Sequence, residues 1–229
     1  QQRPRGTGQG RPLPGWLTLA AQARLFAALR EALGPGVRVI ETHISYVLLT
    51  GAHAYKIKKA VSFGFVDFST LALRRRYCDE ELRLNRRLAP SVYLDVVPIA
   101  GNDERPEPGG TGEAIEYAVS MREFPQEALL SRELERGELS AQEIDALAAI
   151  VAAFHARVAV AKPGEGYGSP EDVLGYAREN VDRLERLRGD RAERVALPAL
   201  REWTEREFAA LRGTIEARLA GGFVRECHG

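Results

Sequence analysis

The pattern of apolar residues changes once along the chain, near residues 122–125, and this change limits the folds open to it. Before it, segments rich in β-branched and aromatic residues are interrupted by helical patterns, whereas after it every apolar pattern has helical spacing. A strand-rich half followed by a helical half predicts an α+β fold with a hinge between two lobes. Clefts between lobes are common places for small ligands to bind.

The order of the expected elements follows from this pattern. Residues 1–16 are rich in Gln, Arg, Gly and Pro and predict a flexible arm, followed by a first lobe at 17–121 and a hinge with a helical lobe at 122–229. In the first lobe we expect a helix at 17–33, followed by a hairpin of strands at 37–49 and 54–61 with a turn at 50–53. A helix capped by Ser69 or Thr70 is expected at 71–88. Strands at 92–99 and 114–121 are expected to form a second hairpin around the loop 101–113. The helices expected in the second lobe are at about 126–136, 140–160, 170–188 and 198–220.

Composition argues against several kinds of partner. The 32 basic and 32 acidic residues balance, so there is no global electrostatic reason to expect nucleic acid or an acidic membrane surface as the main partner. The two cysteines are too few for a disulfide framework, which favours a reducing compartment. No apolar run approaches the roughly 20 residues that a membrane-spanning helix needs. We therefore expect a cytoplasmic protein whose specificity comes from a local site.

The strand expected at 54–61 begins with an unusual pattern, Ala-Tyr-Lys-Ile-Lys-Lys. Because side chains alternate across a strand, Ala54, Lys56 and Lys58 share one face. A small residue two positions before a lysine leaves room for a flat base beside a cation that can reach phosphates. A solvated, lysine-rich edge strand would show the same pattern, so the strand alone leaves both interpretations open.

The helix expected at 71–88 places an acid among apolar side chains. At about 100° per residue, Glu81 falls near the middle of the apolar arc, whereas Glu80 falls just outside it. A carboxylate on an apolar face is unfavourable unless it meets a cation, so Glu81 needs a buried partner. Lys56 on the neighbouring strand is the expected partner. A helix arginine such as Arg74 is the alternative, and either pair could be purely structural.

A strand lysine fixed by a helix glutamate is how kinases hold the α- and β-phosphates of ATP. The order of elements resembles that of protein-kinase-like phosphotransferases, particularly the aminoglycoside-phosphotransferase-like family. Four stretches are similar to a bacterial group of predicted kinases in which the kinase-like part is often followed by a P-loop ATPase domain. These are 41–45 (Glu-Thr-His-Ile-Ser), 54–59 (Ala-Tyr-Lys-Ile-Lys-Lys), 65–70 (Phe-Val-Asp-Phe-Ser-Thr) and 81–90 (Glu-Leu-Arg-Leu-Asn-Arg-Arg-Leu-Ala-Pro).

The resemblance, which covers roughly residues 37–229, implies a fold and an ATP site. The fold would be protein-kinase-like and two-lobed, with an antiparallel N-terminal sheet, one helix and a truncated helical C-terminal lobe. Lys56 would orient the phosphates of ATP and Glu81 would position Lys56, with Ala54 beside the base. The hinge, whose backbone groups would hydrogen-bond the adenine, consists of Met121, Arg122 and Glu123.

The last four residues, Glu-Cys-His-Gly, look like the opening of the catalytic loop His-Gly-Asp-x-x-x-x-Asn. His228 would start this loop, while its Asp, its Asn and a later Asp that together serve the substrate hydroxyl and Mg²⁺ are not in the sequence. Together with the lack of an initiator Met, this predicts a fragment of a longer protein. The pair Cys227 and His228 lacks the second ligand pair of a zinc site, so we assign no metal ligands.

One departure from kinases concerns the phosphates. The first hairpin has no Gly-x-Gly-x-x-Gly loop, and the turn expected at 50–53 carries the single glycine Gly51. Phosphate recognition is therefore not explained by a glycine-rich loop.

The resemblance implies that the parent protein moves the γ-phosphate of Mg-ATP to a hydroxyl of a small molecule. The chain as given would bind nucleotide without turnover, and its expected partners are ATP, a small-molecule hydroxyl substrate and a fused P-loop ATPase domain. One alternative is a non-catalytic nucleotide-sensing or interaction domain that regulates an attached ATPase. Another is an unrelated α+β scaffold, in which Glu81 and Lys56 would lie far apart.

Overall fold

The computed structural model describes residues 19–227, except 64–65, 163 and 187–190, and describes only the backbone at 191–195. The chain divides into two compact units, Gln1–Leu139 and Ser140–Gly229. The segment 122–139, which begins with the expected hinge, thus belongs to the first unit. The arm expected at 1–16 lies outside the described residues.

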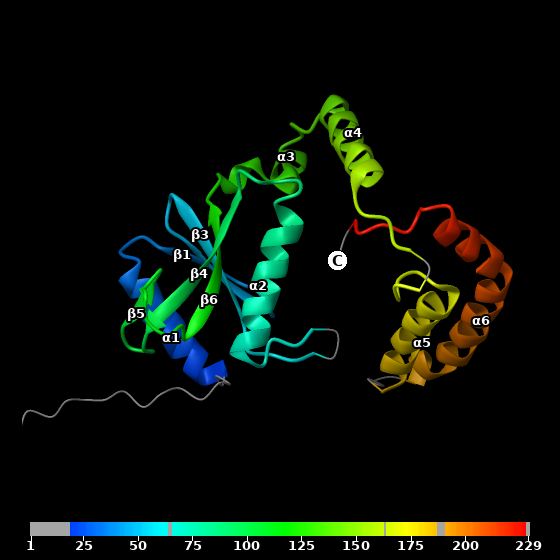
Figure 1. Ribbon diagram of the computed structural model, residues 1–229, viewed down its shortest axis with the longest axis horizontal. Coiled ribbons are helices and arrows are strands. Elements are labelled where there is room, and N and C mark those ends of the chain that lie inside the picture. The colour runs from blue at the N-terminus through cyan, green and yellow to red at the C-terminus, as the bar shows by residue number, and fades with distance from the viewer. Residues whose placement is uncertain (1–18, 64–65, 163, 187–190, 228–229) are drawn as a thin grey trace, which may run out of the picture. The chain divides into compact units, whose positions relative to one another are not determined.

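The first unit is built on a six-stranded antiparallel sheet in the order β1-β2-β3-β6-β4-β5 (Figure 1). The α+β class with an antiparallel sheet is thereby confirmed. The strands are β1 (Arg38–Glu41), β2 (Ser45–Leu49), β3 (His53–Lys58), β4 (Tyr93–Gly101), β5 (Pro106–Pro108) and β6 (Glu116–Arg122). The helical elements are α1 (Leu19–Ala32), α2 (Leu71–Asn85), the 3₁₀ turn η1 (Gln126–Ala128) and α3 (Leu130–Glu135).

Two expectations about the strands were wrong. The segment 37–49 is two strands rather than one, because the Thr42 hydroxyl accepts hydrogen bonds from the Ser45 and Ile44 amides and closes a turn without glycine. The segment 101–113 is not all loop, because β5 pairs with the end of β4. Its prolines are tolerated because β5 is an edge strand.

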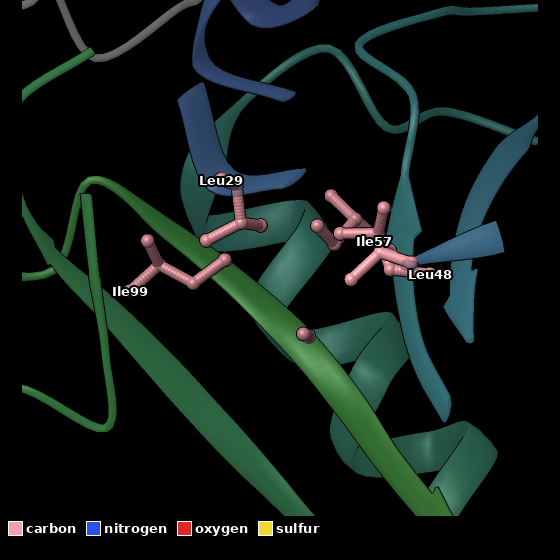
Figure 2. Close-up of a cluster of buried hydrophobic side chains, with 6 residues drawn as sticks. Leu29, Leu48, Ile57 and Ile99 are labelled. Atoms are coloured by element: carbon pink, nitrogen blue, oxygen red, sulfur yellow. The ribbon is translucent and has the colours of Figure 1, made fainter. Parts of the chain in front are cut away.

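Helix α1 covers one face of the sheet and forms the apolar core with it (Figure 2). Leu29 packs with Leu48, Ile57 and Ile99, all of them at most 2% exposed. Ile57 alternates with Lys56 and Lys58 along β3, so the two lysines point to the opposite face. Burying a leucine or isoleucine contributes roughly 1.5–3 kcal/mol, and this cluster holds α1 in place.

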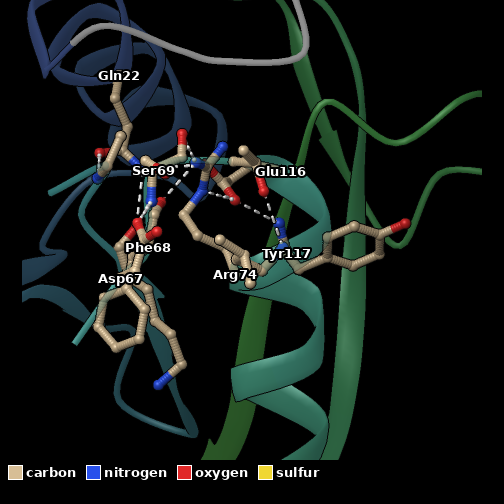
Figure 3. A network of polar contacts seen from close by, with 11 residues as sticks. Gln22, Asp67, Phe68, Ser69, Arg74, Glu116 and Tyr117 are labelled. Atoms are coloured by element: carbon tan, nitrogen blue, oxygen red, sulfur yellow. Dashed lines mark hydrogen bonds and ion pairs between the residues drawn. The ribbon is translucent and has the colours of Figure 1, made fainter. Parts of the chain in front are cut away.

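Helix α2 lies on the lysine-bearing face and is held by a buried ion pair (Figure 3). Its N-cap is Thr70, whose hydroxyl accepts a hydrogen bond from the Leu73 amide. Arg74 donates from Nε to the Glu116 carboxylate at 2.9 Å, and both side chains are fully buried. Gln22 of α1 donates to the same carboxylate at 2.9 Å. Helix α1, helix α2 and strand β6 are therefore joined by one polar network.

The second unit is helical, with α4 (Ala141–Arg157), α5 (Pro170–Arg186) and α6 (Arg191–Ala220). Helix α6 begins seven residues before the expected start at 198 and contains Pro198. Helices α5 and α6 are joined by the ion pairs Arg178–Glu205, Arg201–Asp182 and Arg212–Glu171. None of the helices in the described part of the chain has the length and apolar character required to cross a bilayer.

Candidate functional site

A pocket of about 460 Å³ opens on the face of the first unit's sheet that carries the lysines. This volume is within the range of about 300–1,000 Å³ that is typical of ligand sites. Its walls come from β1, β2, β3, the start of β4 and the end of β6 with the residues that follow. Its apolar lining consists of Ile40, Ile44, Val47, Leu49, Ala54, Met121 and Phe124, and its polar lining of Thr42, His43, Ser45, Lys56, Tyr93, Arg122, Glu123 and Gln126.

The floor of the pocket is set by the pairing of three strands. Ala54 lies opposite Leu49 on one side and Met121 on the other, and two residues along β3 Lys56 lies opposite Val47. Residues directly opposite each other in an antiparallel sheet share a face. The small Ala54 side chain thus lies among larger apolar neighbours and leaves space above it, with the Lys56 amine beside that space.

The ion pair expected between Lys56 and Glu81 is confirmed. The Lys56 Nζ donates to Glu81 Oε1 at 2.7 Å, and the Lys58 Nζ donates to Glu81 Oε2, also at 2.7 Å. The alternative partner, Arg74, is paired with Glu116 instead. The sequence analysis placed Lys58 on the same face as Lys56 but did not assign it to Glu81, although the alternation contained that signal.

Glu81 is ionised because the charges of its two lysines lower the pKa of its carboxyl by more than burial raises it. Burial alone would raise the pKa of the Glu81 carboxyl, but Lys58 and then Lys56 bring this pKa below its ordinary value. Tyr93 lies near the pair, and burial together with the Glu81 charge raises the pKa of its phenol, so it remains a neutral hydroxyl. Lys56 is the member of this group that both binds Glu81 and lines the pocket.

The expected hinge is partly occupied by sheet hydrogen bonds. The Arg122 amide donates to the Val92 carbonyl at 2.8 Å and the Glu123 amide donates to the Ala52 carbonyl at 3.1 Å. Within the described residues, the Glu123 carbonyl and the Phe124 amide have no hydrogen-bond partner, and both residues line the pocket. The backbone groups available to a ligand therefore lie at Glu123, the last residue of the expected segment, and at Phe124, one residue beyond it.

The Glu123 side chain has a role that the sequence analysis missed. Its Oε1 accepts a hydrogen bond from Arg38 Nη2 at 2.7 Å, and its Oε2 accepts one from the Gly51 amide at 2.7 Å. Strand β1, the turn before β3 and the end of β6 are thereby tied together at the pocket's edge. The exposed fraction of the Glu123 side chain is only 6%, as this clamping role requires.

The turn between β1 and β2 also contributes to the pocket. Thr42, His43, Ile44 and Ser45 all line it, and the Ser45 hydroxyl is buried without a hydrogen-bond partner in the described part of the chain. With 37–49 expected as one strand, the turn expected to face phosphates was 50–53. In the structure, this glycine-free segment lines the pocket together with Lys56, whereas none of residues 50–53 does.

The remaining predicted site residue, His228, lies outside the described residues. Cys78 is buried in α2, and burial raises the pKa of its thiol to about 12, so it is an unreactive core residue. Among the residues that the structure describes, no group of three or more His, Cys, Asp or Glu side chains could hold a metal ion. The candidate site of the first unit is thus an apolar pocket with one lysine, Lys56, held at its side by Glu81.

Comparison with known proteins finds relatives but no function. Over 150 residues the chain is 37% identical to the uncharacterized protein Rv2004c of Mycobacterium tuberculosis and to the uncharacterized protein Mb2027c of Mycobacterium bovis. The match covers 66% of this chain and 28% of the length of each of these relatives. No family model matches the sequence, and no solved structure matches it. These relatives therefore bring no functional assignment to this chain.

Proposed function

We propose that the first unit is the nucleotide-binding lobe of a protein-kinase-like phosphotransferase, and that its pocket takes ATP. The observation that carries this proposal is the position of Lys56, which lines an apolar slot and is held by Glu81 at 2.7 Å. A flat base fits above Ala54, between Leu49 and Met121. A phosphate beside it would reach the Lys56 amine.

The backbone at the end of β6 supports a purine in this slot. The Glu123 carbonyl and the Phe124 amide offer one acceptor and one donor at the pocket's edge. Adenine presents a complementary amino donor and ring-nitrogen acceptors on its edges. The apolar slot supplies the burial and these two groups supply the orientation, which is the usual division in a small-molecule site.

The longer protein would then transfer the γ-phosphate of ATP to a hydroxyl of a small molecule in the cytoplasm, with a helical second lobe and an attached P-loop ATPase domain. Mg²⁺ would be carried by the nucleotide's phosphates and neutralise their charge. In this proposal the first unit contributes binding and orientation: Lys56 fixes the phosphates and Glu81 fixes Lys56. The acids that serve the hydroxyl and the metal would come from elsewhere in the longer protein.

The test is the affinity for Mg-ATP of the wild-type chain and of Lys56→Ala, measured by isothermal titration calorimetry. Losing a charge-assisted contact to phosphate should weaken binding by about 10- to 100-fold. Lys59→Ala is the matched control, because Lys59 lies on the same segment but pairs with Glu41 on the other side of the sheet. Equal affinities for wild type and Lys56→Ala would remove Lys56 from the site, and no binding by the wild type would overturn the proposal. Binding by the longer protein without phosphoryl transfer would favour a nucleotide sensor.

A further inference from the structure

Two lysines share one carboxylate beside the pocket, and they are not equivalent. The exposed fraction of the side chain is 31% for Lys56 and 7% for Lys58, although both are 2.7 Å from Glu81. We propose that Lys58 is a positioning residue, the permanent counter-ion of Glu81, which keeps Glu81 paired while Lys56, still bound to Glu81, also contacts an anionic ligand. This inference rests on the proposed function, because it needs a phosphate that competes for Lys56.

Lys58 is held from several sides. Its Nζ lies 5.0 Å from the centroid of the buried Phe68 ring, a cation–π contact. Its carbonyl accepts a hydrogen bond of 2.7 Å from Gln22, which itself is bound into the Glu116 network. Lys58 does not line the pocket, whereas Lys56 does. Lys58 is thus fixed where it can serve Glu81 but not the ligand.

The binding of one lysine to each oxygen of the Glu81 carboxylate has an electrostatic consequence. Glu81 is largely buried, with 12% of its side chain exposed, so removing its last counter-ion would leave a poorly solvated charge. If Lys56 were the sole partner of Glu81, contact between Lys56 and a phosphate would weaken the only ion pair of this buried carboxylate, at a cost in free energy. With Lys58 bound to Oε2, Glu81 stays paired throughout, and Lys56 can share its protons between Oε1 and the phosphate.

The experiment compares Mg-ATP with adenosine as ligands of the whole chain. In Lys58→Met we expect a loss of Mg-ATP affinity of about tenfold or more, with adenosine affinity unchanged, because adenosine fills the slot without reaching Lys56. Lys58→Arg should restore most of the Mg-ATP affinity, since it keeps the charge. Lys59→Met, the neighbouring buried lysine paired with Glu41, should change neither affinity. Calorimetry measures Mg-ATP, and ligand-observed NMR measures the weaker adenosine.

Two results would overturn the role of Lys58: unchanged Mg-ATP affinity in Lys58→Met, or an equal loss for both ligands, which would indicate general damage to the pocket. If the wild type binds neither ligand, the proposed function fails and the nucleotide role of Lys58 fails with it. The sharing of Glu81 is decided separately by urea unfolding of Lys56→Met, Lys58→Met and the double variant. A shared carboxylate requires the double variant to lose more stability than the sum of the single losses, and additive losses would contradict it.

Discussion

Replacing Arg74 by methionine is expected to lower the free energy of unfolding of the first unit by about 3–5 kcal/mol. Arg74 and Glu116 are both fully buried, and Arg74 Nε lies 2.9 Å from the carboxylate (Figure 3). Without the guanidinium, the hydrogen-bond partners left to the Glu116 charge among the described residues would be Gln22 and the Tyr117 amide. Urea unfolding followed by circular dichroism measures the loss.

The same variant should become sensitive to pH. Burial already raises the pKa of Glu116 against the opposing effect of Arg74, and removing Arg74 should raise this pKa further. A carboxyl whose pKa is higher in the folded state than in the unfolded state contributes its full stabilisation below its unfolded pKa, and this contribution is lost as the pH rises from there through the folded pKa. The deficit of Arg74→Met should therefore be greater at about pH 8 than at about pH 5.

Arg76→Met is the matched control for this prediction. Arg76 is exposed two residues further along α2, so its replacement should change the free energy of unfolding by less than about 0.5 kcal/mol. Replacing both Arg74 and Glu116 by methionine should cost less than the sum of the single replacements, because no buried charge is left unpaired. Equal, small effects of Arg74→Met and Arg76→Met would show that the buried pair does not hold α2.

Replacing Ala54 by leucine is expected to reduce Mg-ATP affinity by about 100-fold while leaving the stability nearly unchanged. Ala54 lies on the pocket floor, so the added atoms would occupy the space in which the base is proposed to bind. Ala54 is itself only 6% exposed, but it lines the pocket, so the larger side chain can extend into the pocket volume and avoid the strain that overpacking causes in a closed core. Calorimetry gives the affinity, and urea unfolding gives the stability.

Ala52→Leu provides the control for this second prediction. Ala52 is exposed in the turn before β3 and does not line the pocket, so the same substitution there should not change the affinity. Full Mg-ATP affinity in Ala54→Leu would place the ligand elsewhere. A large loss of stability in Ala54→Leu would show that the floor is a packed core position instead.

The pair Lys56 and Glu81 could be predicted because two independent periodicities agree on it. Strand alternation put Lys56 on the face opposite Ile57, and the helical arc put Glu81 among the apolar residues of α2. The buried partner of Arg74 could not be predicted, because Glu116 lies 42 residues away on β6, where strand pairing and not local pattern brings it close. Long-range register is set by tertiary packing, which a single sequence does not display.

The errors in the strands have local causes. The β1–β2 turn was not predicted because Thr42 closes it with its own hydroxyl, within a segment that contains neither glycine nor proline. Strand β5 was missed because Pro106 and Pro108 argue against a strand, and an edge position removes that objection. The second lysine on Glu81 was predictable in principle, because strand alternation puts Lys58 on the same face as Lys56.

The position of β6 has a consequence for how the protein is made. This strand pairs with both β3 and β4, yet it is the last of the six along the chain. During synthesis from the N-terminus, β3 and β4 would remain without the strand that lies between them until β6 is made. The sheet could therefore form completely only after Arg122 had left the ribosome. A nascent chain arrested before that point would expose unpaired strand edges, the state in which chaperone binding or aggregation begins.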